Sequence, residues 1–448
     1  MPVVGDLPFL LDRMRDQIMI ETSRKTRVFL FLQGPHGPFF HQLGAMLRKS
    51  GARVWRVGFN AGDRAFWPDG ATYIPYRDRP ENWTSTFTDL VAQKQITDIV
   101  LYGDVRAIHA DAITEARRLG LTIHVFEEGY MRPYWVTYER GGSNGHSKLM
   151  QTSIAQMDAQ LAQSDIEAPM PPSHWGDMRQ HVFYGALYHW FVMFFNFGYR
   201  HFKPHRALSV GQEFSLYLKR LFLMPLIWAE RVIATRRIRR GGFPYHLCLL
   251  QLEHDSSFQK HSPFSTMRDF VDLVVRGFSQ GAPRHHHMVF KAHPLEDDRA
   301  QLRSAIREVA RRHGVLDRVH YVRGGKLAQL LSDARSAVTV NSTAAQQVLW
   351  RGIPLKVFGD AVYAKPEFIS GQPLEHFFNA AERPNMRAYK SYRRYLLETS
   401  QVPGGYYSAS GRRQLLRLVV DMMLSRDDPY DALHRGTAAP RQQLRVIN

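Results

Sequence analysis

The chain has 448 residues, a length that predicts two domains. Hydrophobic residues make up 44% of it and charged residues 22%, which excludes a disordered chain and predicts cores that need no disulfides. The net charge of +18 indicates attraction to nucleic acid, anionic lipid or nucleotide phosphates. The single cysteine, Cys248, lies in an apolar run, so we expect it to be buried in a protein of the reducing cytoplasm. The N-terminal residues lack the basic and apolar regions of a signal peptide.

The first 150 residues alternate between apolar runs and helical spacing. After an expected helical opening stretch to about Arg27, strands are predicted at 28–32, 54–57, 98–103 and 122–126, with helices at 41–49 and 112–118. This order predicts a doubly wound parallel sheet, so we assign residues 1–150 to a Rossmann-like domain.

The same alternation restarts near residue 245. It predicts a second parallel sheet with strands at 247–252, 288–291, 319–322 and 337–340. We assign residues 244–375 to a second Rossmann-like domain and 376–448 to C-terminal helices and a tail that is loose after about Asp427. Ligands of such sheets bind beyond the carboxyl ends of the strands, so the functional residues should follow strands.

The segment 151–243 has a different composition and is predicted to be a helical insertion or linker. Between His181 and Arg240 it is rich in aromatic and basic residues, with arginines at 231, 236, 237, 239 and 240. This composition suits contact with a membrane interface, although polar residues interrupt the apolar run and argue against a spanning helix. The alternative is an insertion packed on the protein, whose basic face is simply solvated.

Two acids, Glu127 and Glu128, follow the strand predicted at 122–126. Neighbouring side chains of an extended chain point in opposite directions, so one carboxylate can face a cleft while the other anchors the loop. A second negative charge nearby raises the pKa of a carboxyl group, which suits a general base. Acids are also common at the N-terminus of a helix, which is the alternative explanation.

Two polar motifs follow strands of the second predicted sheet. Lys291-Ala292-His293-Pro294 offers cationic and imidazole groups for a phosphate, and Asn341-Ser342-Thr343 offers hydroxyls and helix amides for the same purpose. The alternatives are a plain turn for the first motif and an ordinary N-cap for the second. His285-His286-His287 is interpreted as a solvated run, and no metal site is predicted.

The combination of an acid pair with His-Pro and Ser-Thr motifs resembles bacterial sialyltransferases of the GT-B type. In those enzymes the acid deprotonates the acceptor hydroxyl, and the His-Pro and Ser/Thr groups hold the CMP phosphate. The resemblance implies two Rossmann-like, doubly wound α/β domains facing a cleft, here with a helical insertion.

Longer motifs at 33–40, 59–63 and 127–137 closely resemble capsule polysaccharide synthesis proteins, the β-Kdo transferases of Gram-negative capsule systems. A third group of residues resembles a motif cluster of the same family: Gln251, Asp255, Ser256 and Ser262. The whole resemblance covers about residues 28–145 and 245–370. It implies a single-module, metal-independent enzyme without a cofactor. The enzyme would move β-Kdo from CMP-Kdo to a (lyso)phosphatidylglycerol-type lipid on the inner face of the cytoplasmic membrane. Its implied partners are the two-module Kdo transferase and the capsule export machinery.

Residue by residue, the resemblance implies the following roles. Glu127 is the general base in a single inverting displacement, with Glu128 as the alternate. The donor would be bound by Lys291, His293, Pro294, Asn341, Ser342, Thr343, Gln251, Asp255 and Ser256, with His293 also assisting catalysis. The acceptor side would be formed by Gln33, Gly34, Pro35, Asn60, Asp63 and Arg132, the last of which meets the Kdo carboxylate or makes a structural ion pair.

The competing hypothesis is a non-catalytic, lipid- or polysaccharide-binding component of capsule export. Nucleic-acid binding has no motif in its favour.

Overall fold

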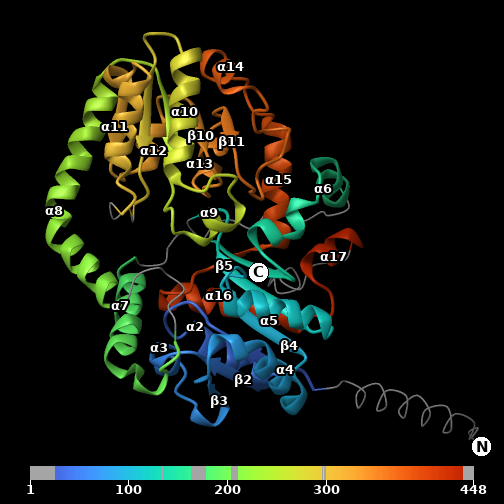
Figure 1. Ribbon diagram of the computed structural model, residues 1–448. Coiled ribbons are helices and arrows are strands. Elements are labelled where there is room, and N and C mark those ends of the chain that lie inside the picture. Colours follow the sequence, from blue (N-terminus) through green and yellow to red (C-terminus); the bar gives the residue numbers. More distant parts are fainter. Residues whose placement is uncertain are drawn as a thin grey trace, which may run out of the picture.

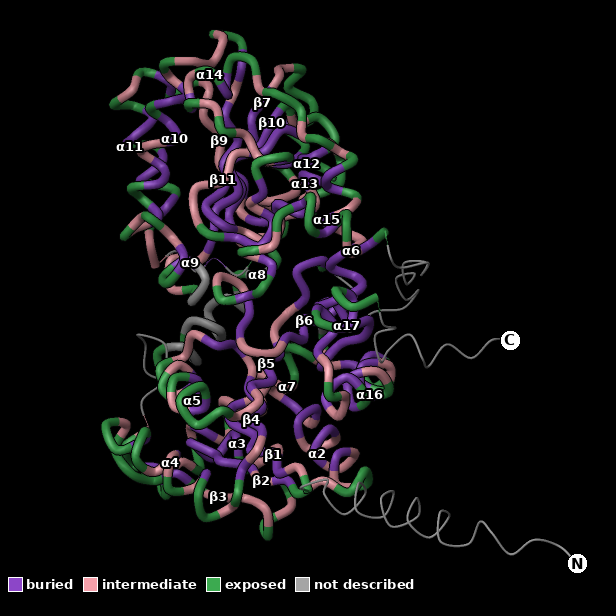
Figure 2. The backbone as a smooth tube through the Cα atoms, turned by 90° about the vertical axis from the view of Figure 1, so that its right-hand side faces the viewer, coloured by how far each residue is buried: buried purple, intermediate pink, exposed green. Residues whose placement is uncertain are grey.

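The computed structural model describes residues 26–132, 135–162, 178–202, 210–294, 296 and 299–436. The described chain forms two α/β domains, one above the other in Figure 1, each built around its own sheet. Buried residues line both sheets in Figure 2, so each domain has a core of its own. This is the GT-B-type architecture that the sequence predicted. The opening helix predicted for the first residues lies outside the described part of the chain.

The first sheet has seven strands in the order β12-β6-β5-β4-β1-β2-β3. Their bounds are β1 (Val28–Phe31), β2 (Arg53–Gly58), β3 (Tyr73–Pro75), β4 (Asp98–Tyr102), β5 (Thr122–Glu128), β6 (Trp135–Arg140) and β12 (Gln401–Pro403). The five strands from β3 to β5 are parallel, but β6 and β12 are antiparallel to their neighbours. The prediction of a purely parallel sheet is therefore wrong at this edge, because the connection after β5 is too short for a crossover helix.

Helices cover both faces of the first sheet. On one face lie α2 (Phe39–Lys49) and α16 (Ala409–Leu424), and on the other α4 (Trp83–Lys94) and α5 (Ala107–Arg118). Alternate residues of β1 serve the two cores: Phe29 and Phe31 pack on the first face, and Val28 and Leu30 on the second. A strand buried on both sides reads as a continuous apolar run, which is why β1 was predictable.

The second sheet is wholly parallel, with strand order β11-β10-β7-β8-β9. Its strands are β7 (Tyr245–Leu249), β8 (His287–Lys291), β9 (Val319–Val322), β10 (Ala334–Thr339) and β11 (Leu355–Val357). Its helices are α9 (Ser256–His261), α10 (Met267–Gly281), α11 (Leu302–Arg312), α12 (Leu327–Leu331), α13 (Ala345–Trp350) and α14 (Leu374–Asn379). Cys248 in β7 is fully buried, as predicted.

The interpretation of a solvated histidine run is correct for His285, which is exposed, but wrong for His286, which is buried, and in part for His287, which is partly buried. His286 is only 3% exposed and shares a hydrogen bond of 3.0 Å with His246, and burial lowers its pKa to about 4. The His287 ring stacks on Phe243 at 3.8 Å between centroids. Because β8 begins at His287, strand pairing brings His287 and the preceding His286 into the domain. Within the described residues, no cluster of three or more His, Cys, Asp or Glu side chains is arranged to hold a metal.

The C-terminal segment crosses back from the second domain to the first. After α15 (Met386–Thr399), strand β12 pairs with β6, and α16 packs against α2. The expected loose tail is wrong as far as residue 436, because α17 (Pro429–His434) buries Tyr430 and Leu433. Residues 437–448 lie outside the described part of the chain. The segment 376–448 thus contributes a strand as well as helices, and it completes the first domain.

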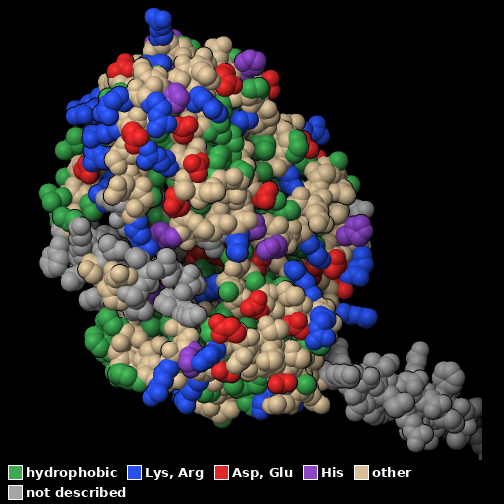
Figure 3. All heavy atoms as spheres, viewed as in Figure 1, with side chains coloured by type: hydrophobic (Ala, Val, Ile, Leu, Met, Phe, Trp, Pro, Cys, Tyr) green, Lys and Arg blue, Asp and Glu red, His purple; other side chains and the backbone are tan. Residues whose placement is uncertain are grey.

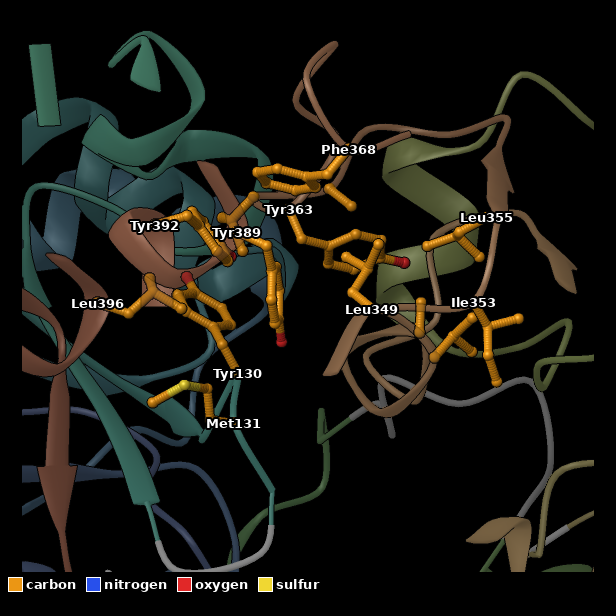
Figure 4. Packing of buried hydrophobic residues seen from close by; sticks show 14 of the residues in the cluster. Tyr130, Met131, Leu349, Ile353, Leu355, Tyr363, Phe368, Tyr389, Tyr392 and Leu396 are labelled. Atoms are coloured by element: carbon orange, nitrogen blue, oxygen red, sulfur yellow. The ribbon is translucent and has the colours of Figure 1, made fainter. Parts of the chain in front are cut away.

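One hydrophobic cluster joins the two domains (Figure 4). Tyr130 and Met131 of the first domain belong to the same buried cluster as Tyr363, Tyr389 and Tyr392, which come from the second domain and α15. The Lys365 amino group also donates a hydrogen bond to the carbonyl of Leu149 across this boundary, at 2.6 Å. These contacts hold the two domains together on the side of α15 (Figure 1).

The middle segment is helical, as predicted, and comprises α6 (Ile154–Leu161), α7 (Met178–Phe195) and α8 (Val210–Arg240). Helix α7 packs on the first domain against α3 (Ala61–Ala65), and α8 runs along the second domain past β9 and α12 (Figure 1). Within the described residues, no helix combines the length and apolarity needed to cross a bilayer.

Candidate active site

The acid pair forms the last two positions of β5 rather than following the strand, because β6 extends the pairing to Glu128. The two carboxylates point to opposite faces, as predicted for neighbours in an extended chain. Glu127 lies beside the turn after β4, where a Cβ on Gly103 would stand 3.1 Å from its Oε2 atom. Glu128 lies on the other face, where the hydroxyl groups of Tyr102 and Tyr407 donate to its Oε1 atom at 3.2 and 3.4 Å. The two acids therefore have different surroundings.

Burial raises the pKa of Glu127 to about 7, with smaller contributions to this rise from the negative charges of Glu128 and Asp104. The backbone N–H of Glu128, which donates to Glu127 Oε1 at 2.9 Å, and the Arg132 guanidinium oppose this rise. A carboxyl group with a pKa near 7 can both accept and release a proton near neutral pH. These are the properties expected of a general base.

Asp104, His146 and His261 form a polar bridge beside Glu127. Asp104 is buried, and its Oδ2 atom accepts from the backbone N–H of Ser143 at 2.8 Å and lies 3.1 Å from His146 Nδ1. The His146 ring then contacts the ring of His261, in α9 of the second domain, at 5.3 Å between centroids. The bridge therefore reaches from the first sheet to the second domain.

The sequence analysis missed this bridge, although one signal was available. Asp104 follows the turn after β4, at the same sheet edge as Glu127. His146 and His261 gave no comparable signal, because only the packing of the two domains brings them together.

On the donor side, Lys291 is the last residue of β8 and is only 6% exposed. Its amino group makes one long hydrogen bond, of 3.4 Å, to the carbonyl of Ala292, and no described carboxylate pairs with it. Burial lowers the pKa of Lys291 to about 8, with a smaller contribution from the nearby Arg231 guanidinium. His293 and Pro294 follow in the loop, with His293 partly buried and Pro294 exposed. A buried ammonium group that lacks a carboxylate is suited to binding an anion.

Asn341, Ser342 and Thr343 follow β10 as predicted. The N-cap of α13 is Ala344, so neither hydroxyl residue is the N-cap itself. Ser342 instead shapes the loop: its hydroxyl accepts from the backbone N–H of Ala344 at 3.3 Å, and its carbonyl accepts from Tyr363 at 2.6 Å. Thr343 is partly exposed beside it.

Gln251 and Asn341 are buried and bind each other. Gln251 donates to Asn341 Oδ1 at 2.7 Å and accepts from its backbone N–H at 2.9 Å. The Asn341 side chain also donates to the carbonyl of His261 at 3.0 Å. These two predicted donor residues thus join the loops after β7 and β10 to α9.

The other residues of that cluster lie nearby. Asp255 is exposed immediately before α9, whereas the Ser256 side chain lies outside what the structure describes. Ser262 closes a local turn through its hydroxyl group and the backbone of Phe264.

The predicted acceptor residues meet at the carboxyl ends of β1 and β2. Asp63 is buried, pairs with Arg56 at 3.2 Å, and accepts from Gln33 at 3.1 Å. Gln33 in turn accepts from Arg106 at 3.3 Å. Asn60 caps α3 by accepting from the backbone N–H of Asp63.

Asn60 also donates to the hydroxyl group of Tyr188 in α7, at 2.6 Å. Gly34, Pro35 and Asp63 line a small hollow together with Tyr188. Asn60 and Asp63 hold this loop and α7 in place, so any effect they have on an acceptor would be indirect.

Arg132 lies near both acids. Burial would lower the pKa of Arg132, but the charges of Glu128 and Glu127 raise it, with a further contribution from Asp255 of the second domain. Its Nε atom donates to the carbonyl of Gly129 at 3.3 Å. The effect of the Asp255 charge places Arg132 near the second domain. Figure 3 shows a hollow between the two domains.

Comparison with known proteins places the chain among capsule proteins. Residues 97–407 match the profile of a family described as "Capsule polysaccharide biosynthesis protein". The capsule polysaccharide export protein KpsS of Escherichia coli is 30% identical over 380 residues, which cover 85% of this chain and 96% of KpsS. The capsule polysaccharide modification protein LipB of Neisseria meningitidis serogroup A is 29% identical over 385 residues, which cover 85% of this chain and 91% of LipB.

Among solved structures, one that resembles this chain is the KpsC β-Kdo 2,7 transferase of Thermosulfurimonas dismutans. The alignment covers 88% of this chain and 99% of the KpsC chain. The TM-score is 0.42 and the sequence identity is 10%.

Proposed function

Because the chain belongs to the capsule polysaccharide biosynthesis family, we propose that it is a glycosyltransferase that moves β-Kdo from CMP-Kdo to a (lyso)phosphatidylglycerol-type lipid. This transfer would start the linker of a capsular polysaccharide. The observation that supports it most is the pairing of two features at the domain boundary. One is the partly buried carboxyl group of Glu127, whose pKa is about 7, and the other is the buried ammonium group of Lys291 in the second sheet.

In the proposed reaction Glu127 takes the proton of the acceptor hydroxyl group. The acceptor oxygen forms a bond to the anomeric carbon while the bond from that carbon to the CMP phosphate oxygen breaks. Lys291 and His293 stabilise the negative charge that develops on the leaving phosphate. Neither a metal nor a cofactor is needed in this scheme. A single displacement inverts the anomeric configuration, whereas retention would point to a covalent intermediate on a carboxylate.

We further propose that the middle segment holds the enzyme on the inner face of the cytoplasmic membrane. Ten of the thirteen large exposed hydrophobic side chains in the described part of the chain lie between Val182 and Ile233. We call these ten residues the hydrophobic ridge: Val182, Phe183, Trp190, Phe194, Phe195, Phe197, Leu223, Leu226, Trp228 and Ile233. Lys and Arg side chains gather beside α8 and α11 in Figure 3, where they would meet anionic headgroups. A large exposed apolar surface with basic neighbours is typical of an interfacial contact.

One experiment tests the transfer directly. The purified protein is incubated with CMP-Kdo and a short-chain lysophosphatidylglycerol, and the products are identified by mass spectrometry. We expect a lipid carrying one Kdo together with free CMP, and NMR of the product then reports its anomeric configuration. CMP-sialic acid serves as the matched donor control. Binding of the lipid without any transfer would overturn the proposal and favour a non-catalytic role in export.

A further inference from the structure

Helix α8 carries an arginine to the edge of the second sheet where Lys291 lies. The side chain of Arg231 runs along the loop after β9, which contains Gly324 and Gly325. A Cβ on Gly325 would stand 3.3 Å from Arg231 Cγ, and a Cβ on Gly324 would stand 3.7 Å from both Arg231 Cδ and the Pro294 Cα atom. Both glycines have positive φ, of 77° and 92°, which L side chains rarely adopt. The loop thus leaves room for Arg231 to approach the His-Pro motif.

The two cations at this edge have no described anionic partner. No carboxylate of the described residues pairs with Lys291 or with Arg231. Two acids on and beside α8 pair with other residues: Glu230 pairs with Arg303 at 2.7 Å, and Asp333 lies 3.9 Å from Arg239. Like charges close together at a buried position destabilise each other unless an anion lies between them. An anionic ligand bound between Lys291 and Arg231 would relieve this repulsion.

We propose that Arg231 is a donor-binding residue that, with Lys291, holds the phosphate of a cytidine nucleotide. The inference rests on the proposed function, because it places the ligand at the site described above, and it adds a group from the middle segment to that site. A guanidinium group suits this task, since it binds two phosphate oxygens in a fixed geometry. Helix α8 then forms one wall of the donor site, in addition to contributing to the hydrophobic ridge.

Isothermal titration of CMP and of cytidine into the full chain tests this assignment. The test variant is Arg231→Gln, which keeps most of the stem that packs on Gly325 but removes the charge. The matched control is Arg236→Gln, which changes an exposed arginine on the same helix. We expect Arg231→Gln to weaken CMP binding about 10- to 100-fold, the range for a charge-assisted phosphate contact, and to leave cytidine binding unchanged. The control should bind both ligands as the parent does.

The outcomes separate the two proposals. If the parent binds CMP and Arg231→Gln binds it equally well, the role of Arg231 is overturned while the proposed function stands. If the variant loses CMP and cytidine affinity in equal measure, Arg231 supports the loop rather than the phosphate, and the inference is again overturned. If the parent itself binds neither CMP nor CMP-Kdo, the proposed function fails and this inference fails with it. A thermal melt of each variant checks that the fold is kept.

Discussion

Glu127 and Glu128 are neighbours in the sequence, yet their carboxyl groups are placed for different tasks. The hydroxyl groups of Tyr102 and Tyr407 donate hydrogen bonds to Glu128 on the face covered by α2 and α16. Glu127 lies near Asp104, and its raised pKa keeps a proton available for exchange near neutral pH. This difference favours Glu127 as the base and gives Glu128 the role of anchoring the end of β5.

The roles of the two acids can be separated by replacing each one. We expect Glu127→Gln to lower the transfer rate by ~10²–10⁴, the usual effect of losing a general base, while CMP affinity stays near that of the parent. Glu128→Gln should retain more activity. Initial rates with CMP-Kdo and titrations with CMP measure both quantities. If Glu128→Gln is inactive and Glu127→Gln is active, Glu128 is the general base instead.

Asp104 should set the pH at which Glu127 becomes active. The transfer rate should rise as the pH passes about 7, where Glu127 loses its proton, and fall above about 8, where Lys291 loses its charge. Asp104→Asn removes a negative neighbour, so the pKa of Glu127 falls and the rising limb moves to lower pH. The falling limb should stay in place.

The control for this profile is Asp111→Asn, which changes an exposed acid on α5. It should leave both limbs where they are. A rising limb that does not move in Asp104→Asn would show that Glu127 does not govern it.

At the scale of elements, α7 is held to the first domain through close packing on α3. The Tyr188 ring lies against Gly62, where a Cβ would stand 2.6 Å from the ring atoms Cδ2 and Cε2. The ring also stacks on His36 at 4.3 Å between centroids. One face of α7 thus packs on the first domain, while the residues of the hydrophobic ridge that lie in α7, such as Trp190 and Phe194, are exposed.

Gly62→Ala should therefore separate α7 from α3. Overpacking of this kind lowers the free energy of unfolding by about 1–3 kcal/mol. Gly211→Ala, in the first turn of α8, is the matched control, because its Cβ would meet nothing within 4 Å. Thermal melting and limited proteolysis of the α7 region measure the effect. Equal stability and equal protection of the two variants would contradict the packing argument.

At the scale of the whole molecule, the hydrophobic ridge and the arginines of α8 make separate contributions to membrane binding. Trp190→Ser with Phe194→Ser should weaken co-sedimentation with phosphatidylglycerol vesicles at low and high salt alike, because apolar burial is not screened. Charge reversal of Arg236, Arg237 and Arg240 should release the protein only at moderate salt, at about 1 kcal/mol per basic residue. Arg239 is left unchanged because it lies beside Asp333.

Trp350→Ser, which alters an exposed tryptophan on α13, is the control for the loss of an aromatic side chain. If the ridge variant binds vesicles as well as this control does, the hydrophobic ridge is not the membrane contact. Transfer to a detergent-dispersed acceptor should be unaffected in all three variants.

The sequence by itself determined four parallel strands of each sheet, the motifs near their carboxyl ends and the family. These features are local: apolar runs report burial on both faces, and a motif lies within a few consecutive residues. Glu127, Lys291 and Ser342 were found in this way. Only the tertiary structure decided which distant residues join them.

Strand β12 pairs with β6 more than 250 residues away, and α17 packs where a loose tail was expected. His286 and His287 were predicted to be solvated because the sequence does not show that β8 pairs with β7 at this point. The Asp104–His146–His261 bridge depends on the docking of the two domains, and the position of Arg231 depends on how α8 lies against the loop after β9. Contacts between residues far apart in the chain leave no periodic trace in the sequence, so only the folded chain reveals them.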